Sequence, residues 1–247
     1  MSNTEKAVET FAGADLPSGP GWYFDPRTRF SFSATSVSLN PSAPDDTSEK
    51  EVYTHTLLFA THTNTSREGR IDLLLGRKLR GFAKGSFNGV GGKICRDETP
   101  LECIMRETAE EINVHLESEQ VRFSARVRID VDQGEKICIA VYRTNLDDEQ
   151  RGAARGSEEI FPVWFKMTRP SIESDLPWDS MRPEHQVYLA PLLHHHISQE
   201  LDQQQETIFD VQVRFEPEPK KDELGEGEKP ENHRKVRSWE MGAFRTS

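Results

Sequence analysis

Alternation of apolar and polar residues predicts several β-strands in this chain. The clearest run is 121–131, where every second residue is hydrophobic, so we expect one apolar and one polar face along the whole strand. Shorter runs rich in β-branched and aromatic residues predict further strands. We expect these at 53–60, 71–75, 136–142, 160–165 and 208–215. Because proline cannot donate to a strand ladder, Pro162 predicts that strand 160–165 lies at an edge or a bulge.

Two stretches have the apolar spacing of helices. The first follows Thr99, a good N-cap, and Pro100, which suits a first helical turn. Its mostly apolar face consists of Leu101, Ile104, Met105 and Thr108. The second spans 183–203, with a bend expected at Pro191, whereas the polar stretch 147–157 is expected to be a loop. The resulting order, β-β-α-β-β-β-α-β, predicts an α+β fold: an α/β/α sandwich with a mixed β-sheet between helices.

The two ends of the sequence lack this patterning. Residues 1–50 form a largely irregular extension rich in Ser, Thr, Pro, Gly and Asp, with an aromatic patch at 22–32. We expect that patch either to pack on the domain or to act as a docking arm or lid. Residues 216–247 combine mixed charges with prolines and show no apolar periodicity, so we expect a disordered tail. The folded domain is therefore expected at 51–215.

Charge and cysteine content exclude some classes of protein. The net charge of −11 argues against a binder of nucleic acid polymers or membrane surfaces, which needs a basic stripe. The three cysteines, Cys95, Cys103 and Cys138, have no metal-ligand spacing and cannot all pair, which favours a reducing compartment. The first residues have neither a basic start nor an apolar run. We therefore expect a protein of the cytoplasm or nucleus. We also expect it to be a monomer.

The first predicted helix carries a cluster of carboxylates. Glu107, Glu110 and Glu111 are spaced i, i+3 and i+4, so they converge over one turn. A solvated helix face is the ordinary explanation of such a pair of adjacent glutamates. Like charges at this spacing destabilise a helix, however, and a cation among them removes that cost. Hard oxygen ligands at this density suit Mg²⁺, with Mn²⁺ as the alternative.

The surrounding residues show that the cluster is part of a longer motif. Its fixed positions are Gly92, Glu98, Arg106, Glu107, Glu110, Glu111 and Val114. Their spacing matches the Nudix box, G-x5-E-x7-R-E-U-x-E-E-x-G-U with U aliphatic, and the chain resembles the Nudix hydrolase family. Two positions depart mildly from it. Thr108 replaces an aliphatic residue but keeps a methyl group, and Asn113 replaces the glycine that ends the helix.

The resemblance implies a fold and a set of site residues. The implied fold is the Nudix α/β/α sandwich with a mixed sheet and a loop-helix-loop box. The implied metal ligands are the carbonyl of Gly91 and the carboxylates of Glu107, Glu110, Glu111 and Glu159. Glu110 or Glu159 is the expected base that orients or deprotonates water. Arg106 and Glu98 are expected to pair and brace the segment rather than to touch substrate.

Residues 76–93, GRKLRGFAKGSFNGVGGK, resemble more narrowly the MutT-homologue hydrolases of oxidised purine nucleoside triphosphates such as 8-oxo-dGTP and 2-hydroxy-dATP. The resemblance implies that Lys78 lies near phosphates and that Phe82 and Asn88 shape and read a purine pocket. Thr54 is assigned to the same substrate-binding set. Where that group has Trp-Pro-Asp-Asp, this chain has Arg182, Pro183, Glu184 and His185. We expect Arg182 to stack on the base and Glu184 to pair with its edge, whereas His185 cannot copy the second aspartate.

These residues predict Mg²⁺-dependent hydrolysis of an oxidised or normal purine nucleoside triphosphate to the monophosphate and pyrophosphate, a nucleotide-pool sanitation activity. Two alternatives stay open at this point. One is a Nudix hydrolase of another substrate, such as a dinucleoside polyphosphate. The other is a non-catalytic sensor that binds a nucleotide without turning it over.

Overall fold

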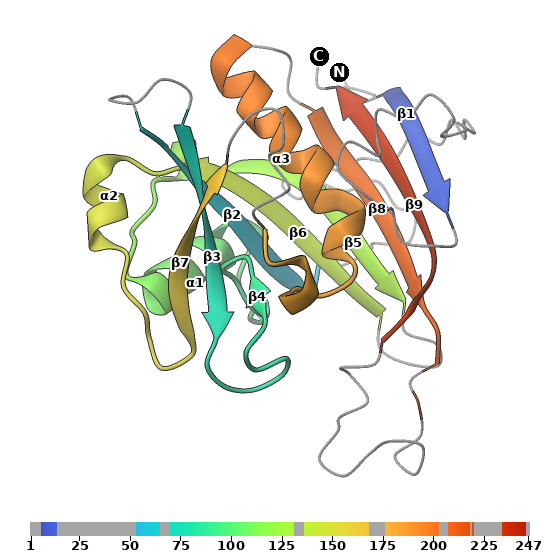
Figure 1. The fold of residues 1–247 in the computed structure, drawn as a ribbon, viewed down its shortest axis with the longest axis horizontal. Helices are drawn as coiled ribbons and strands as arrows, with labels where there is room; N and C mark the ends of the chain where they lie inside the picture. Colours follow the sequence, from blue (N-terminus) through green and yellow to red (C-terminus); the bar gives the residue numbers. More distant parts are fainter. Residues whose placement is uncertain are drawn as a thin grey trace.

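A computed structural model describes residues 6–13, 53–64, 70–130, 136–167, 176–202, 207–217, 219 and 234–245. Within these ranges a single mixed β-sheet is flanked by helices on both faces (Figure 1). The strands are β1 (Lys6–Gly13), β2 (His55–Asn64), β3 (Arg70–Lys78), β4 (Phe87–Asn88), β5 (Arg122–Asp130), β6 (Lys136–Asn145), β7 (Ile160–Met167), β8 (Thr207–Phe215) and β9 (Val236–Arg245). The α-helices are α1 (Pro100–Ile112), α2 (Asp148–Ala153) and α3 (His185–Asp202).

The sheet combines antiparallel and parallel pairs. Its strand order is β1-β9-β8-β5-β6-β2-β3-β4, and β7 pairs with β3 beside that path. β2 runs parallel to β6 and β5 parallel to β8, whereas the other neighbours are antiparallel. The predicted sandwich with a mixed sheet is therefore confirmed. Pro162 lies in β7, whose described pairing is with β3 alone, as expected for a strand at an edge.

Two hydrophobic clusters lie on opposite faces of the sheet. The larger one packs α3, through residues such as Val187, Tyr188 and Leu192, against inward side chains of β2, β3, β5, β6, β8 and β9. The smaller one packs α1, through Ile104 and Ile112, against β2, β3, β6 and β7. No helix in the described ranges is long and apolar enough to cross a membrane.

The expected alternation along 121–131 fails near its start. A β-bulge lies between Phe123 and Ala125, where β5 loses register with β6. Ala125 packs in the α3-side cluster, whereas Val121 and Phe123 pack in the α1-side cluster. An extra residue in one strand reverses the direction of every side chain beyond it, so the strand serves both cores. The polar stretch expected as a loop also contains α2, which begins with an Asp147 N-cap.

The expectation of a disordered tail is wrong for residues 236–245. They form β9, which lies between β8 and β1 in the sheet (Figure 1). Trp239, Met241 and Ala243 alternate along β9 and are buried in the α3-side cluster. Glycine and charged residues between them dilute this period in the sequence. At the other end, β1 forms a strand within the extension expected to be largely irregular, and the aromatic patch 22–32 lies outside the described residues.

Replacing Trp239 by alanine should destabilise the protein strongly, because the side chain is 4% exposed in the α3-side cluster. We expect the free energy of unfolding to fall by about 3–5 kcal/mol, as for other buried aromatic side chains. Urea unfolding followed by circular dichroism measures this. The matched control is Arg237→Ala on the same strand, whose exposed side chain should change stability by less than about 0.5 kcal/mol. Equal, small effects of both changes would contradict a packed β9.

Candidate active site

The loop before α1 is held against the start of β2 by backbone hydrogen bonds. The Leu58 amide donates to the Val90 carbonyl over 2.7 Å, and the Thr56 amide donates to the Gly92 carbonyl over 2.9 Å. Between them Gly91 has a φ of +146°, and a Cβ there would lie 2.3 Å from the Thr56 carbonyl oxygen. Glycine is therefore required at this position. The loop consequently runs close along the strand and presents its next residues to α1.

Helix α1 begins and ends as its sequence predicts. Thr99 accepts a hydrogen bond from the Glu102 amide, and the Glu102 carboxylate accepts one from the Thr99 amide, forming a capping box. At the other end Asn113 adopts the left-handed conformation, with φ 57° and ψ 34°, and its amide donates to Ala109. Asparagine tolerates that conformation better than most residues. The substituted Asn113 thus keeps the helix end that the motif needs.

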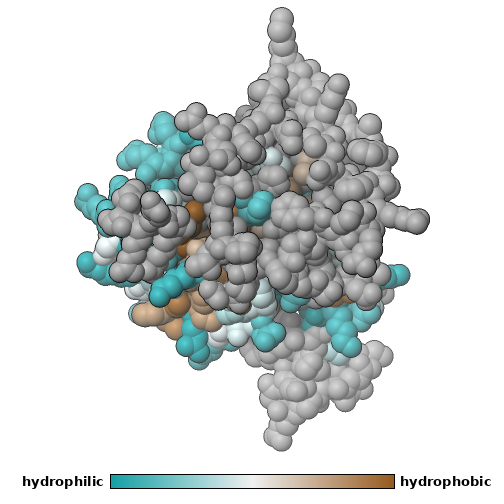
Figure 2. Space-filling model, turned by 45° about the horizontal axis from the view of Figure 1, so that its top comes forward, coloured by the Kyte–Doolittle hydropathy of each residue, from teal (hydrophilic) through white to brown (hydrophobic). Residues whose placement is uncertain are grey.

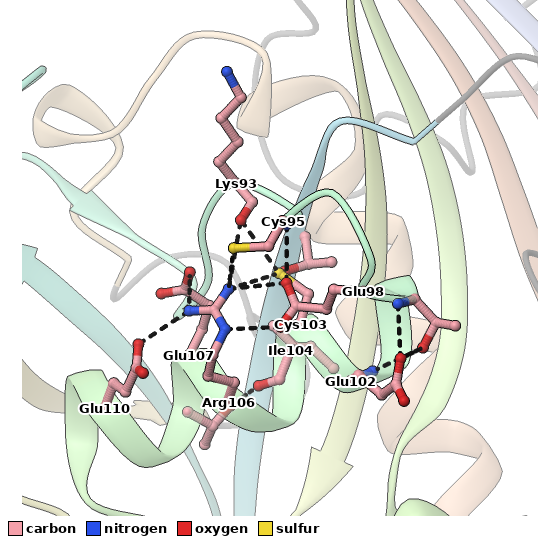
Figure 3. A network of polar contacts seen from close by, with 12 residues as sticks. Lys93, Cys95, Glu98, Glu102, Cys103, Ile104, Arg106, Glu107 and Glu110 are labelled. Atoms are coloured by element: carbon pink, nitrogen blue, oxygen red, sulfur yellow. Dashed lines mark hydrogen bonds and ion pairs between the residues drawn. The ribbon is translucent and has the colours of Figure 1, made fainter.

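Arg106 joins three glutamates of the motif (Figure 3). Its Nε and Nη2 donate to the two oxygens of Glu98 over 2.7 and 3.0 Å, the expected pair. Its Nη1 also donates to Glu107 Oε1 over 2.9 Å and to Glu110 Oε2 over 3.0 Å. The bonds from Arg106 lower the pKa of Glu98 to about 2. One guanidinium therefore braces the loop against α1 and offsets part of the like-charge repulsion on the helix.

Glu111 is the buried member of the glutamate cluster, with 7% of its surface exposed. Its Oε2 accepts a 3.0 Å hydrogen bond from the Gly91 amide. Burial raises the pKa of Glu111 to about 7, although that bond and the charge of Lys78 act in the opposite direction. The charges of Glu107 and Glu159 add to the rise. A carboxylate in this position is costly to ionise unless a cation is near.

Glu107 lies directly beside the glycine loop. A Cβ on Gly92 would come within 2.4 Å of Glu107 Oε1, so the carboxylate occupies the space that a larger residue would fill. Burial raises the pKa of Glu107 as well, against the opposing effect of Arg106. Glu107 and Glu111 therefore converge on neighbouring residues of one loop.

Glu110 and Glu159 do not complete a closed cluster with them. Glu110 is exposed and bonds to Arg106, while Glu159 pairs with Arg80, which lowers the pKa of Glu159. Within the described ranges, no three His, Cys, Asp or Glu side chains are gathered as a ready metal cage. The convergence of all the predicted carboxylates on one point is therefore not seen. Arg80, to which the sequence assigned no role, is the partner that holds Glu159.

The donor set still fits a divalent cation. Glu107 and Glu111 are both desolvated, and the charge of Glu107 adds to the cost of ionising Glu111. Their oxygens are hard ligands. A bound cation would remove that cost because it favours the charged form of both. Glu110 is paired with Arg106 and Glu159 with Arg80. A bound cation would compete with these arginines for the carboxylate oxygens. The described carboxylates are therefore suited to Mg²⁺ or Mn²⁺.

A second group of side chains surrounds Asn88 at the end of β4. Asn88 Oδ1 accepts from the Gly89 amide over 2.9 Å and lies 2.7 Å from His185 Nε2. Burial lowers the pKa of His185 to about 4, so the ring is neutral at pH 7 and carries its hydrogen on Nε2. The Asn88 oxygen is thereby occupied, and its NH₂ group stays available as a donor. His185 is thus a partner of Asn88, although the sequence indicated no role for it.

Arg182 and Glu184 form an ion pair beside this group. Glu184 is 2% exposed; burial acts to raise its pKa, but the charge of Arg182 outweighs burial and lowers it. Glu184 Oε2, His185 Nδ1 and Tyr188 Oη are buried without a hydrogen-bond partner among the described residues. These three atoms lie on one helical turn, so they form a polar patch inside an apolar core. Sequence reasoning missed Tyr188, which only helical spacing from Glu184 could have indicated.

Of the remaining predicted residues, Phe82 and Lys78 lie beside the groups described above, whereas Thr54 does not. Phe82 is 44% exposed and lies under the guanidinium of Arg182, with Cζ 4.9 Å from the ring centroid. Lys78 lies near the carboxylates, since its charge lowers the pKa of both Glu111 and Glu159. Thr54 behaves differently. Its hydroxyl donates to the Cys138 carbonyl and accepts from the Cys138 amide, and its carbonyl accepts from the Ile94 amide. Its described contacts thus link the start of β2 to β6 and to the loop before α1, not to Asn88.

The surface of the molecule has both hydrophilic and hydrophobic areas (Figure 2). Among the described residues, the large hydrophobic side chains most exposed to solvent are Leu79, Phe82 and Phe161. Leu79 and Phe82 belong to the loop between β3 and β4, next to the Asn88 group. An exposed aromatic side chain beside a buried polar patch is a suitable wall for a planar ligand.

Comparison with known proteins matches these features to one family. A family model described as NUDIX domain matches residues 60–190. The oxidized purine nucleoside triphosphate hydrolase of Danio rerio is 30% identical over 101 residues, 41% of this chain and 61% of the relative. The mouse (Mus musculus) protein of that name is 29% identical over 122 residues, 49% of this chain and 70% of the relative. This chain thus spans less than two thirds of the zebrafish relative.

A solved structure agrees at the level of the fold. The MutT/nudix family protein from Enterococcus faecalis has a TM-score of 0.50 and 15% identity, covering 64% of this chain and 71% of its own. None of these matches covers the whole of this chain. β9 in particular lies beyond the residues that the family model matches.

Glu111→Gln should stabilise the metal-free protein at neutral and higher pH. The folded protein holds a proton on Glu111 up to a pKa of about 7, against an ordinary value of 4.5. It therefore binds more protons than the unfolded chain between these values, and its stability falls as pH rises through this window. Glutamine keeps the acceptor for Gly91 without the charge. We expect the variant to gain about 1–3 kcal/mol over the wild type at pH 8 and little at pH 4.

Thermal melting from pH 4 to 8 in EDTA measures this difference. The control is Glu110→Gln, which removes an exposed carboxylate from the same turn and should change stability little at any pH. A Glu111→Gln variant that melts below the wild type at pH 8 would show that the buried charge is already compensated.

Proposed function

Because the chain belongs to the Nudix family, we propose that it is a pyrophosphohydrolase that cleaves a purine nucleoside triphosphate to the monophosphate and pyrophosphate. The observation that carries the proposal is that Asn88 and Gly91, whose amide binds the Glu111 carboxylate, belong to one short segment. Asn88 and Gly91 are three residues apart, so their backbones are separated by no more than about 10 Å. A single nucleotide can therefore reach both, with its base at Asn88 and its phosphates at the carboxylates.

The residues that would hold the metal are Glu107 and Glu111, with the Gly91 carbonyl, Glu110 and Glu159 as further ligands. When bound, a divalent cation neutralises phosphate charge and lowers the pKa of water. Lys78 adds a positive charge next to the carboxylates, where the phosphate chain would lie. With these groups, the anionic part of a nucleotide would lie over the second half of α1, beside Gly91.

A carboxylate of this chain would take the proton from the attacking water. Glu110 is suited to that role because its side chain is 61% exposed and Arg106 holds it by one oxygen. Glu159 is less suited, since Arg80 lowers its pKa and weakens it as a base. Arg106 would stay with Glu98 and orient both Glu107 and Glu110, which is a positioning role.

The purine preference rests on the Asn88 group. Asn88 offers NH₂ to an acceptor on the base, and the unpartnered Oε2 of Glu184 offers an acceptor to a donor on it. Phe82 supplies an apolar wall, with Arg182 over its ring. The names of the zebrafish and mouse relatives add support for an oxidised purine nucleotide as substrate.

Glu111→Gln should abolish most of the activity while leaving the protein folded. Loss of a metal-site carboxylate lowers turnover by at least about 10²-fold. The assay incubates normal and oxidised nucleotides with Mg²⁺ and measures pyrophosphate against orthophosphate release. Glu149→Gln, an exposed glutamate on α2, is the control and should retain wild-type turnover. Near-full activity of Glu111→Gln would refute the assignment of the site, and a wild type inactive on every triphosphate would refute the proposed reaction.

Asn88→Ala should lower kcat/KM for purine triphosphates by roughly 5- to 150-fold, because a buried hydrogen-bond partner is lost. Pyrimidine triphosphates should be much less affected. Asn88→Asp tests the NH₂ group alone, since aspartate keeps an acceptor for Gly89 and His185 but lacks the NH₂ donor. We expect it to lose purine activity as well. Equal losses for purines and pyrimidines would mean that Asn88 only shapes the turn.

A further inference from the structure

Arg234 lies two residues before β9, far from the motif in sequence and beyond the residues that the family model matches. Its guanidinium nevertheless reaches the predicted base site. Cζ of Arg234 lies 5.5 Å from the centroid of the Phe82 ring, within the range of a cation–π contact. The same atom lies 6.0 Å from the centroid of Phe215.

The two aromatic rings belong to distant parts of the sheet. Phe82 is in the loop between β3 and β4, whereas Phe215 ends β8, and β5, β6 and β2 lie between these strands in the sheet. The side chain of Arg234 thus bridges this span. The pairing of β9 with β8, and the burial of Trp239 and Met241 in the core, hold the preceding residues in place. Packing of β9 therefore anchors the Arg234 side of the contact.

Two guanidinium groups consequently meet at Phe82. Arg182 lies 4.9 Å from the same ring centroid and is paired with Glu184. Together with the Asn88 NH₂ group, these arginines make this side of the site rich in donors. A guanine-type base presents two acceptors, O6 and N7, on one edge, and arginine is the side chain that pairs best with them. An adenine-type base presents an NH₂ donor there instead.

We propose that Arg234 is a specificity-determining residue of the base site, donating to the acceptor edge of a guanine-type purine held beside Phe82. The proposal rests on the proposed function, since it names the class of base that this site selects. It also assigns a substrate role to the residues that lead into β9, whose Arg234 contacts Phe82 in the loop between β3 and β4. The unpartnered Oε2 of Glu184 is consistent with the same base, whose ring N–H and NH₂ groups need an acceptor.

Arg234→Gln tests this, with Arg237→Gln as the matched control on exposed β9 surface. kcat and KM are measured for guanosine and adenosine triphosphates. Binding of their α,β-methylene analogues is measured by calorimetry, which needs no turnover. We expect Arg234→Gln to lower kcat/KM and affinity for the guanine compounds by about 10-fold, mainly through KM, with about 2-fold or less for the adenine compounds. Arg234→Lys, which keeps the charge without the planar fork, should recover part of this loss.

The outcomes separate this proposal from the proposed function. If the wild type binds the analogues but hydrolyses neither nucleotide, the reaction is refuted, while the guanine preference is still decided by binding. If Arg234→Gln behaves like Arg237→Gln, the proposal is overturned. An equal loss for guanine and adenine compounds, accompanied by a lower melting temperature, would also overturn it, because Arg234 would then only fasten the C-terminal segment to the loop.

Discussion

A single guanidinium joins the loop and the helix of the carboxylate segment. Arg106 contacts Glu98, Glu107 and Glu110 at once, and without it three carboxylates would repel one another across one turn and its loop. Its bidentate bond to Glu98 fixes the loop, and the loop in turn offers the Gly91 amide to Glu111. The most buried carboxylate of the site is thus positioned by a backbone group whose own position depends on an ion pair at the surface.

The group around Asn88 presents a different electrostatic problem. Glu184 and His185 are buried and Arg182 is partly buried, so charge has to be balanced within a few residues. Arg182 balances Glu184, and His185 stays neutral because burial lowers its pKa to about 4. The oxidised-purine hydrolases that this chain resembles have Trp, Asp and Asp where this chain has Arg182, Glu184 and His185. This difference keeps the group almost neutral and replaces acceptors by donors around Asn88.

Sequence reasoning located the strands and the motif helix because local chemistry determines them. Thr99 and Asn113 marked the ends of α1, and both caps are formed. It failed where tertiary context decides. The bulge at Phe123 arises from pairing with β6, and β9 needs β8 beside it before Trp239 can be buried. Within the site, the spacing of the glutamates predicted their helix face but not that Glu111 would be buried. The bond of His185 to Asn88 joins residues too distant in sequence for any local pattern to predict.

The pairing of β1 with β9 also governs how the protein is made. β1 is synthesised long before β9, its described partner, because more than 200 residues separate the two strands. Contacts of such long sequence separation slow folding, and an unpaired strand edge is open to association with other chains in the meantime. The central strands can assemble first, so this edge is the last to close. During synthesis this edge of the sheet is therefore exposed to wrong association for longer than the central strands.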